Sequence, residues 1–158
     1  MRYGTIIARK AGKFMKILVI NGPNLNLLGT REPTIYGNQS YAALLQFLEE
    51  TAREAGVDIG VFQSNHEGAI VDRIQQAIGN FDGLIINPAA YTHTSIAIPD
   101  AISAGGIPTV EVHLSDISDR EDFRKISYTS RVCKKVIMGK GFAGYAEAIL
   151  YLAQNFQG

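Results

Sequence analysis

The sequence predicts an α/β protein built on one doubly wound, five-stranded parallel sheet of the flavodoxin-like type. From Lys16 onward, short aliphatic runs alternate with segments whose apolar residues recur at helical spacing, and this alternation repeats five times. Repeated strand–helix units favour a parallel sheet with helices on both faces, because crossover connections are right-handed. The 158 residues contain no linker or internal repeat, so one domain is expected.

The strand predictions depend on short runs such as KILVIN, which is apolar at nearly every position. A strand covered by helices on both faces needs that composition, whereas a half-exposed strand alternates apolar and polar residues. The five predicted strands are 16–21, 58–63, 83–87, 109–113 and 132–138.

The helix predictions combine apolar spacing with residues that begin and end helices. Ser40 suits the N-cap of the first helix and Gly56 its end. Three further helices are predicted at 67–78, at 95–103 and, as a short one, at 120–125. Gly141 is expected to open the last helix, which should pack these side chains inward: Tyr145, Ala148, Ile149, Leu152 and Phe156.

Composition excludes several classes of function. Fifteen basic residues balance fifteen acidic ones, which argues against nucleic acid or an anionic membrane as partner. No apolar run approaches the roughly 20 residues of a membrane span. Cys133 is the only cysteine, so no internal disulfide can form and a reducing, cytoplasmic location is expected. Residues 1–14 lack the apolar core of a signal peptide and are interpreted as an extension preceding the domain 15–158.

Polar residues collect after three of the predicted strands. In a parallel sheet the carboxyl ends of the strands meet at one edge, where ligands bind in open α/β folds. The residues expected there are Asn24, Arg31 and Tyr36 after the first strand, Asn87 and His93 after the third, and Glu111, His113 and Ser115 at the fourth.

Proton transfer is the chemistry that these groups favour. Cys133 falls within a predicted strand rather than at an exposed turn, and neither a P-loop nor a dinucleotide-binding glycine motif follows the first strand. A tyrosine has an ordinary pKa near 10, and a nearby guanidinium favours its phenolate form. Tyr36, with Arg31 five residues earlier, is therefore a candidate base, with a histidine opposite as acid.

Other interpretations stay open from these residues alone. Tyr36 could simply pack over the sheet, His113 could be a hydrogen-bonded core histidine, and Arg120 could serve the surface or a subunit contact. The spacing of His93, Asp100, Glu111 and His113 provides no short ligand pair on a helix, so no metal is expected.

Two other classes of protein share the predicted topology. A flavin- or phosphate-binding module would need a Ser/Thr/Gly-rich loop after the first strand, where this chain has Pro23, Leu25, Leu27 and Leu28. A signalling receiver would need an acidic cluster at the strand ends, but the first strand ends in Asn21.

Five segments together carry a resemblance to a known family. They are NGPNLNLLGTREPTIYG (21–37), QSNHEG (63–68), NPAAYTHTS (87–95), EVHLS (111–115) and REDFR (120–124). Their content and order strongly resemble the type II 3-dehydroquinate dehydratases, and the similarity runs from about Lys16 to the C-terminus. The resemblance implies a flavodoxin-like fold and a cofactor-free anti elimination of water from 3-dehydroquinate through an enolate, giving 3-dehydroshikimate. That reaction belongs to the shikimate pathway of aromatic amino acid biosynthesis.

The resemblance also implies roles for five catalytic residues. Tyr36 matches the tyrosine that removes the C2 proton, and Arg31 the arginine that activates it. Asn24 matches an asparagine that helps to hold the water bridging to the enolate. His113 matches the general acid for the leaving hydroxyl, with Glu111 as its orienting carboxylate.

Substrate binding and assembly are implied in the same way. Family members bind the substrate carboxylate, bind the ring hydroxyls and complete the pocket of a neighbouring subunit, without a cofactor, a metal or a lysine imine. The matching residues here are Asn87, Leu114 and Ser115 for the carboxylate, His93 and Arg124 for the hydroxyls, and Asp100 for the neighbouring subunit. The family's usual assembly is a dodecamer built from trimers, so a homo-oligomer is expected.

Overall fold

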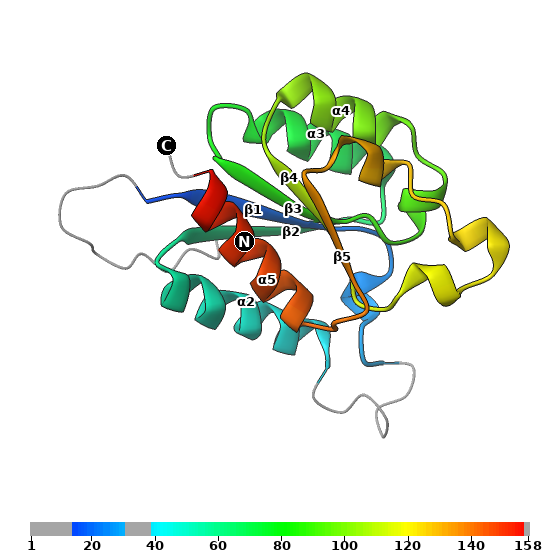
Figure 1. Ribbon diagram of the computed structural model, residues 1–158, viewed down its shortest axis with the longest axis horizontal. Helices are drawn as coiled ribbons and strands as arrows, with labels where there is room; N and C mark the ends of the chain where they lie inside the picture. Colours follow the sequence, from blue (N-terminus) through cyan, green and yellow to red (C-terminus); the bar gives the residue numbers. More distant parts are fainter. Residues whose placement is uncertain (1–13, 31–38, 157–158) are drawn as a thin grey trace.

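A computed structural model describes residues 14–30 and 39–156. Figure 1 shows a central sheet between two layers of helices. All strand pairs are parallel, and the strand order is β2-β1-β3-β4-β5. The strands are β1 (Lys16–Asn21), β2 (Asp58–Gln63), β3 (Gly83–Asn87), β4 (Thr109–His113) and β5 (Lys135–Met138). The predicted fold class is confirmed.

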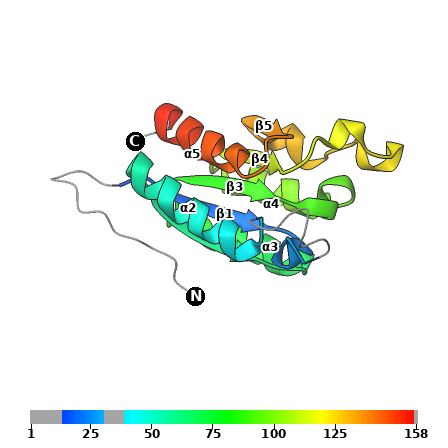
Figure 2. The ribbon, with the colours of Figure 1, turned by 90° about the horizontal axis from the view of Figure 1, so that it is seen from below.

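Helices cover both faces of the sheet, as the apolar strand runs predicted. α2 (Tyr41–Ala55) and α5 (Ala143–Asn155) cover one face, and α3 (Glu67–Ala77) and α4 (Ala97–Gly105) cover the other. Figures 1 and 2 show the two helix pairs on opposite sides of β1, β3 and β4. Every residue of β3 and of β4 is buried, which the double cover explains.

Alternate residues of each central strand enter different cores. Ile17 and Val19 of β1 pack in the core beneath α2 and α5, whereas Leu18 and Ile20 pack in the core beneath α3 and α4. As predicted, Tyr145, Ala148, Ile149 and Leu152 face the first of these cores, and Phe156 packs partly buried against it.

The first helix confirms both of its predicted caps. The Ser40 Oγ accepts a hydrogen bond from the Ala43 amide at 3.1 Å, and Gly56 closes the helix with a left-handed φ of 67°. The bounds of β1, β2, β3 and β4 also match the prediction.

Several predicted bounds were wrong. The strand predicted at 132–138 begins only at Lys135, because Val132 belongs to a 3-10 turn (Thr129–Val132) that brings the chain to the edge of the sheet. Cys133 therefore precedes β5 instead of lying within it.

Smaller differences affect four helices. The helix predicted at 95–103 is Ala97–Gly105, although the Ser95 Oγ still accepts from the Ile98 amide at 3.0 Å. The helix predicted at 67–78 ends one residue earlier, and the one opened by Gly141 begins at Ala143. The helix predicted at 120–125 is only a 3-10 turn at Asp122–Arg124, too short to form an α-helical turn.

Gly22 brings the carboxyl ends of β1 and β3 into close contact. Its amide donates to the Asn87 carbonyl at 2.8 Å. A Cβ on Gly22 would lie 2.3 Å from the Pro88 carbonyl oxygen, so only glycine fits at this crossing.

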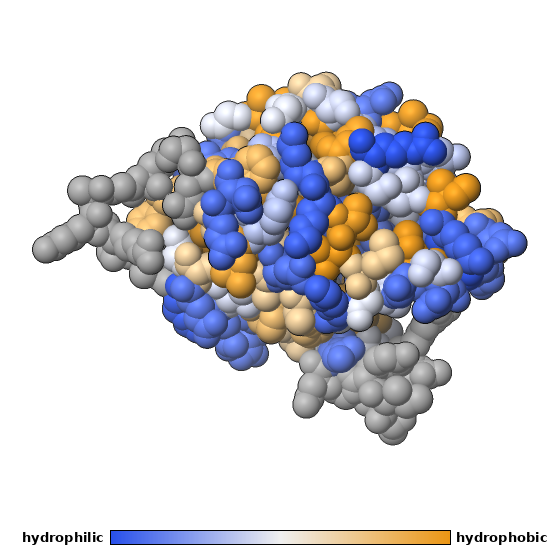
Figure 3. Space-filling model, viewed as in Figure 1, coloured by the Kyte–Doolittle hydropathy of each residue, from blue (hydrophilic) through white to orange (hydrophobic). Residues whose placement is uncertain are grey.

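Polar and apolar residues alternate over the molecular face seen in Figure 3. Within the described part of the chain, no helix is long and apolar enough to cross a membrane.

Candidate active site

A pocket of about 290 Å³ opens at the carboxyl edge of the sheet. It is lined by residues that end or follow β1, β3 and β4, as we predicted from the meeting of parallel strand ends at one edge. Seven predicted site residues line it: Asn24, Asn87, His93, His113, Leu114, Ser115 and Arg124.

His113 and Glu111 form a buried pair beneath this pocket. The His113 Nε2 lies 2.6 Å from the Glu111 Oε1, and the two residues are 5% and 0% exposed. They point to the same face because they are two residues apart on one strand. The pair is the arrangement expected of an acid–base histidine with an orienting carboxylate.

Glu111 is held as a carboxylate. Its burial, the largest single effect, raises the pKa of the side chain. Hydrogen bonds from His113, Thr92 and Ser127, together with the charge of His113, outweigh burial and leave the pKa below the usual value. An ionised carboxylate only accepts hydrogen bonds, so the His113 Nε2 carries a proton and Nδ1 is left for the pocket.

The rim residue His93 is fixed by the segment that follows the fourth strand. Its Nδ1 lies 2.6 Å from the Ile126 carbonyl oxygen, and the Tyr128 amide donates to the Thr92 carbonyl at 2.8 Å. A carbonyl can only accept, so Nδ1 of His93 is protonated and Nε2 is left to contact a ligand.

Asn87 is anchored by a buried network that reaches α5. The Asn87 Nδ2 donates to the Tyr145 hydroxyl at 3.1 Å, and that hydroxyl donates to the Asn21 Oδ1 at 2.7 Å. The Ala89 amide donates to the Asn87 Oδ1 at 3.1 Å. Burial, the largest effect, raises the pKa of Tyr145 far above its ordinary value, so its hydroxyl stays neutral.

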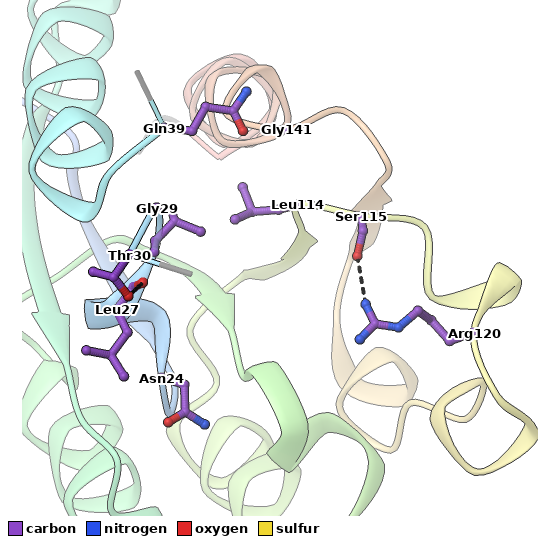
Figure 4. Close-up of a pocket in the computed structure, with 10 residues that line it drawn as sticks. Asn24, Leu27, Gly29, Thr30, Gln39, Leu114, Ser115, Arg120 and Gly141 are labelled. Atoms are coloured by element: carbon purple, nitrogen blue, oxygen red, sulfur yellow. Dashed lines mark hydrogen bonds between the residues drawn. The ribbon is translucent and has the colours of Figure 1, made fainter. Parts of the chain in front are cut away.

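Two arginines make one side of the pocket cationic. Arg124 and Arg120 both line it, and the Arg120 Nη1 donates to the Ser115 Oγ at 3.3 Å. Figure 4 shows Arg120 directed toward Ser115 across the space next to Leu114. Arg120 is exposed, as a surface residue would be, but its position at the pocket was not predicted from the sequence.

A second hollow, of about 610 Å³, adjoins the first. The two share Asn24, Leu114, Ser115 and Arg120. Figure 4 shows that Thr30 and Gln39 both lie on the side of this second hollow away from Arg120.

The QSNHEG segment supports the loop after β1. The Gln63 Nε2 donates to the Gly22 carbonyl at 3.1 Å, and the Asn65 Oδ1 accepts from the Asn24 amide at 3.0 Å. The Tyr91 hydroxyl donates to the Asn65 carbonyl at 2.8 Å. Asn24 itself adopts a left-handed φ of 67°, which asparagine tolerates, and lines both hollows.

Three predicted site residues are not placed at the two hollows by the described part of the chain. Two of them, Arg31 and Tyr36, lie outside the described residues. Asp100 is exposed in the first turn of α4 and lines neither hollow.

Cys133 is no candidate nucleophile. Burial first, and then the nearby Glu111 charge, raise the pKa of its thiol to about 12. Across the described ranges, no group of three or more His, Cys, Asp or Glu side chains is arranged to hold a metal ion.

The fold and this edge define a parallel α/β protein with a histidine–carboxylate pair for proton transfer. The family model described as dehydroquinase class II matches residues 15–153, and the chain belongs to that family.

Named relatives and solved structures agree with this assignment. The chain is 53% identical to catabolic 3-dehydroquinase 1 of Aspergillus fumigatus, covering 89% of this chain and 94% of that protein. It is 52% identical to 3-dehydroquinate dehydratase of Lachnospira eligens, covering 89% and 99%. The crystal structure of type II dehydroquinase from Butyrivibrio crossotus superposes with a TM-score of 0.85 at 51% identity, covering 89% of this chain and 99% of the other.

Proposed function

We propose that this dehydroquinase-family protein is a 3-dehydroquinate dehydratase, a hydro-lyase that works by acid–base catalysis. The C2 proton passes to the Tyr36 phenolate and the electron pair forms an enolate. The C1–O bond then breaks as the enolate collapses to the new double bond, and His113 gives its proton to the departing hydroxyl. The products are 3-dehydroshikimate and water.

The observation that carries this proposal is the buried contact between His113 and Glu111 at the pocket. The carboxylate accepts from Nε2 of His113, so Nδ1 is the nitrogen that can deliver a proton to the leaving group. Glu111 also stabilises the imidazolium from which that proton departs.

The roles of Tyr36 and Arg31 rest on the family to which the chain belongs, because both residues lie outside the described part of the chain. Thr30 and Gln39, the described residues nearest to them in the sequence, line the second hollow, which adjoins the pocket that contains His113. An anti elimination requires base and acid on opposite faces of the substrate ring, so Tyr36 is proposed to act on the face opposite His113. Arg31 would favour the phenolate over the neutral phenol.

An anionic substrate matches the charge of the pocket. Arg120 and Arg124 supply two guanidinium groups, and Ser115, Leu114 and Asn87 lie beside them to bind the substrate carboxylate. His93 Nε2 is available to a ring hydroxyl, and Asn24 to a water at the enolate oxygen.

We also propose that the chain assembles as a homo-oligomer, a dodecamer of trimers, in which Asp100 serves the pocket of a neighbouring subunit. Support comes from the exposure of Asp100 and from apolar surface close to it in the chain, where Ile96 is 55% exposed.

We propose a cytoplasmic location, which fits a chain with one cysteine. Residues 1–14, which lie almost entirely outside the described part of the chain, are proposed as an extension that precedes the domain.

The function is tested by mixing the purified protein with 3-dehydroquinate in metal-free buffer and following ultraviolet absorbance. The product is a conjugated enone carboxylate, so absorbance should rise in proportion to enzyme. Activity should survive a chelator, and also borohydride added with substrate, because neither metal nor imine takes part.

Tyr36→Phe should bind substrate but lose nearly all turnover. A flat trace from folded wild-type protein would refute the function, and a fully active Tyr36→Phe would refute the assigned base.

A further inference from the structure

Two hydroxyl groups converge on the Glu111 carboxylate from elements far apart in the chain. The Thr92 Oγ1, on the 3-10 helix after β3, lies 2.5 Å from the Glu111 Oε1. The Ser127 Oγ, from the segment before β5, lies 2.7 Å from the same oxygen. The two hydroxyls are 2.8 Å from each other, so three oxygens form a closed triangle.

The two hydroxyls supply fewer hydrogens than there are oxygen–oxygen contacts in the triangle. Each hydroxyl has one hydrogen to donate, and the ionised carboxylate has none. Two hydrogens therefore serve three oxygen–oxygen contacts. When both lie within the triangle, they either both go to Glu111, or one hydroxyl donates to the other and that one donates to Glu111. In every such arrangement at least one hydroxyl donates to the carboxylate.

The carboxylate depends on the donors to this one oxygen. Glu111 is fully buried, and its Oε2 has no hydrogen-bond partner among the described residues. Within the described residues, Oε1 has three donors, which are His113 and the two hydroxyls. A buried carboxylate that loses its donors takes up a proton more readily, because burial disfavours its charged form.

We propose that Thr92 and Ser127 are a redundant pair of positioning residues, of which either one alone holds the Glu111 carboxylate against His113. Neither residue lines either of the two hollows described above, so we assign to both a positioning role behind Glu111. When both hydroxyls are absent, Glu111 becomes protonated in the working pH range and His113 loses its charged partner. The catalytic consequence rests on the proposed function, whereas the effect on Glu111 does not.

The redundancy is tested with Thr92→Val, Ser127→Ala and the double variant, each assayed for kcat/KM across pH. Each single variant should stay within about threefold of the wild type. The double variant should fall by about 10- to 100-fold, the effect of losing a hydrogen bond to a charged group. The acid limb of its pH profile should move to higher pH, whereas the limbs of the single variants should not move.

Matched controls are available in the same turn. Thr129→Val removes a buried hydroxyl that has no partner within the described ranges, and Ser130→Ala removes a bond to the Ser127 carbonyl while leaving the triangle intact. Combining either control with Thr92→Val should reproduce the activity of Thr92→Val alone. Activity losses that are merely additive in the Thr92/Ser127 double variant, or an unmoved acid limb, would overturn the proposal.

A second readout does not depend on turnover. Urea unfolding at pH 3 to 7 should show that wild type and both single variants lose stability together as Glu111 is protonated. In the double variant Glu111 binds a proton more readily when folded than when unfolded, so the stability gap between the double variant and the wild type should be widest near pH 7 and narrow as pH falls. If all four curves run parallel, the proposal is wrong. If the wild type shows no activity on 3-dehydroquinate, the function fails while this series still decides the role of the pair.

Discussion

The His113 Nε2 lies 2.6 Å from the Glu111 Oε1, and the two side chains share one face of β4 because they are two residues apart. This contact fixes which imidazole nitrogen is available at the pocket. It also sets a buried negative charge directly behind the proposed proton donor.

Replacing Glu111 by Gln separates its charge from its hydrogen bond. The amide oxygen can still accept from the His113 Nε2, but no charge remains to stabilise the imidazolium. We expect kcat/KM to fall by about 100-fold, within the range that acid–base groups contribute. Steady-state kinetics with 3-dehydroquinate measures the loss, and circular dichroism checks the fold. An unchanged kcat/KM would show that the carboxylate charge is irrelevant to turnover.

Acid should weaken the folded state through Glu111. Its folded pKa lies below the usual value for a glutamate, so the folded protein binds this proton less readily than the unfolded chain does. The stabilisation is therefore fully present above the unfolded pKa of about 4.3 and is lost as pH falls through the lower folded pKa. Urea unfolding should show that, below about pH 5, the wild type loses stability relative to Glu111→Gln, which has no carboxyl to protonate at this position. A gap that stays constant from pH 7 to pH 3 contradicts the assignment.

Tyr145→Phe should weaken both the fold and substrate binding. The change leaves the buried Asn21 Oδ1 without its donor and frees one side of Asn87, at a cost of about 1–3 kcal/mol in the free energy of unfolding. We also expect KM to rise more than kcat falls, because Asn87 contacts substrate in the proposed complex.

A tyrosine on the same helix provides the control for that variant. Tyr151 is half-buried on α5, and no hydrogen bond of its hydroxyl occurs within the described ranges. Tyr151→Phe should therefore change unfolding and KM little. Equal effects of the two substitutions would argue against a role for the network at Asn87.

Gly22→Ala should separate the ends of β1 and β3. Its new methyl would lie 2.3 Å from a backbone oxygen at Pro88, which cannot rotate away as a side chain can. Overpacking of this kind costs about 1–3 kcal/mol, and turnover should fall with it because Asn24 and Asn87 flank the crossing. Chemical unfolding and kcat measure the two effects.

Gly68→Ala is the matched control for the glycine variant. Gly68 lies in the first turn of α3, where a Cβ would meet nothing within 4 Å, so alanine should add up to about 1 kcal/mol of stability. Destabilisation by both substitutions to the same extent would contradict the steric account of Gly22.

The sequence predicted the sheet well because four strand runs are aliphatic and bounded by residues that end strands. β5 was the exception, because Val132 and Cys133 look like strand residues although Val132 ends a 3-10 turn and Cys133 follows that turn. The Ser127 Oγ accepts from the Ser130 amide and holds that turn, while Ser127 also contacts Glu111 16 residues away. Local propensity contains no information on that contact.

The same limit separates the predicted from the missed site residues. Asn87 and His113 are the last residues of β3 and β4, and His93 ends the 3-10 helix that follows β3, so topology brings all three to one edge. The hydroxyl of Tyr145 was missed because it reaches Asn21 across 124 residues, and α5 had to be placed first. Thr92 lay within a recognised segment, but its contact with Ser127 spans 35 residues.

Turnover of 3-dehydroquinate by wild type and by His113→Gln, compared in one absorbance assay, is the most direct test of the proposed acid. The glutamine amide nitrogen can take the place of the imidazole Nε2 and still donate to Glu111, but it cannot protonate a leaving hydroxyl. We expect enone formation by the wild type and a loss of at least about 100-fold in kcat for the variant, with the fold unchanged. No product from the wild type, or a variant with kcat close to that of the wild type, would contradict it.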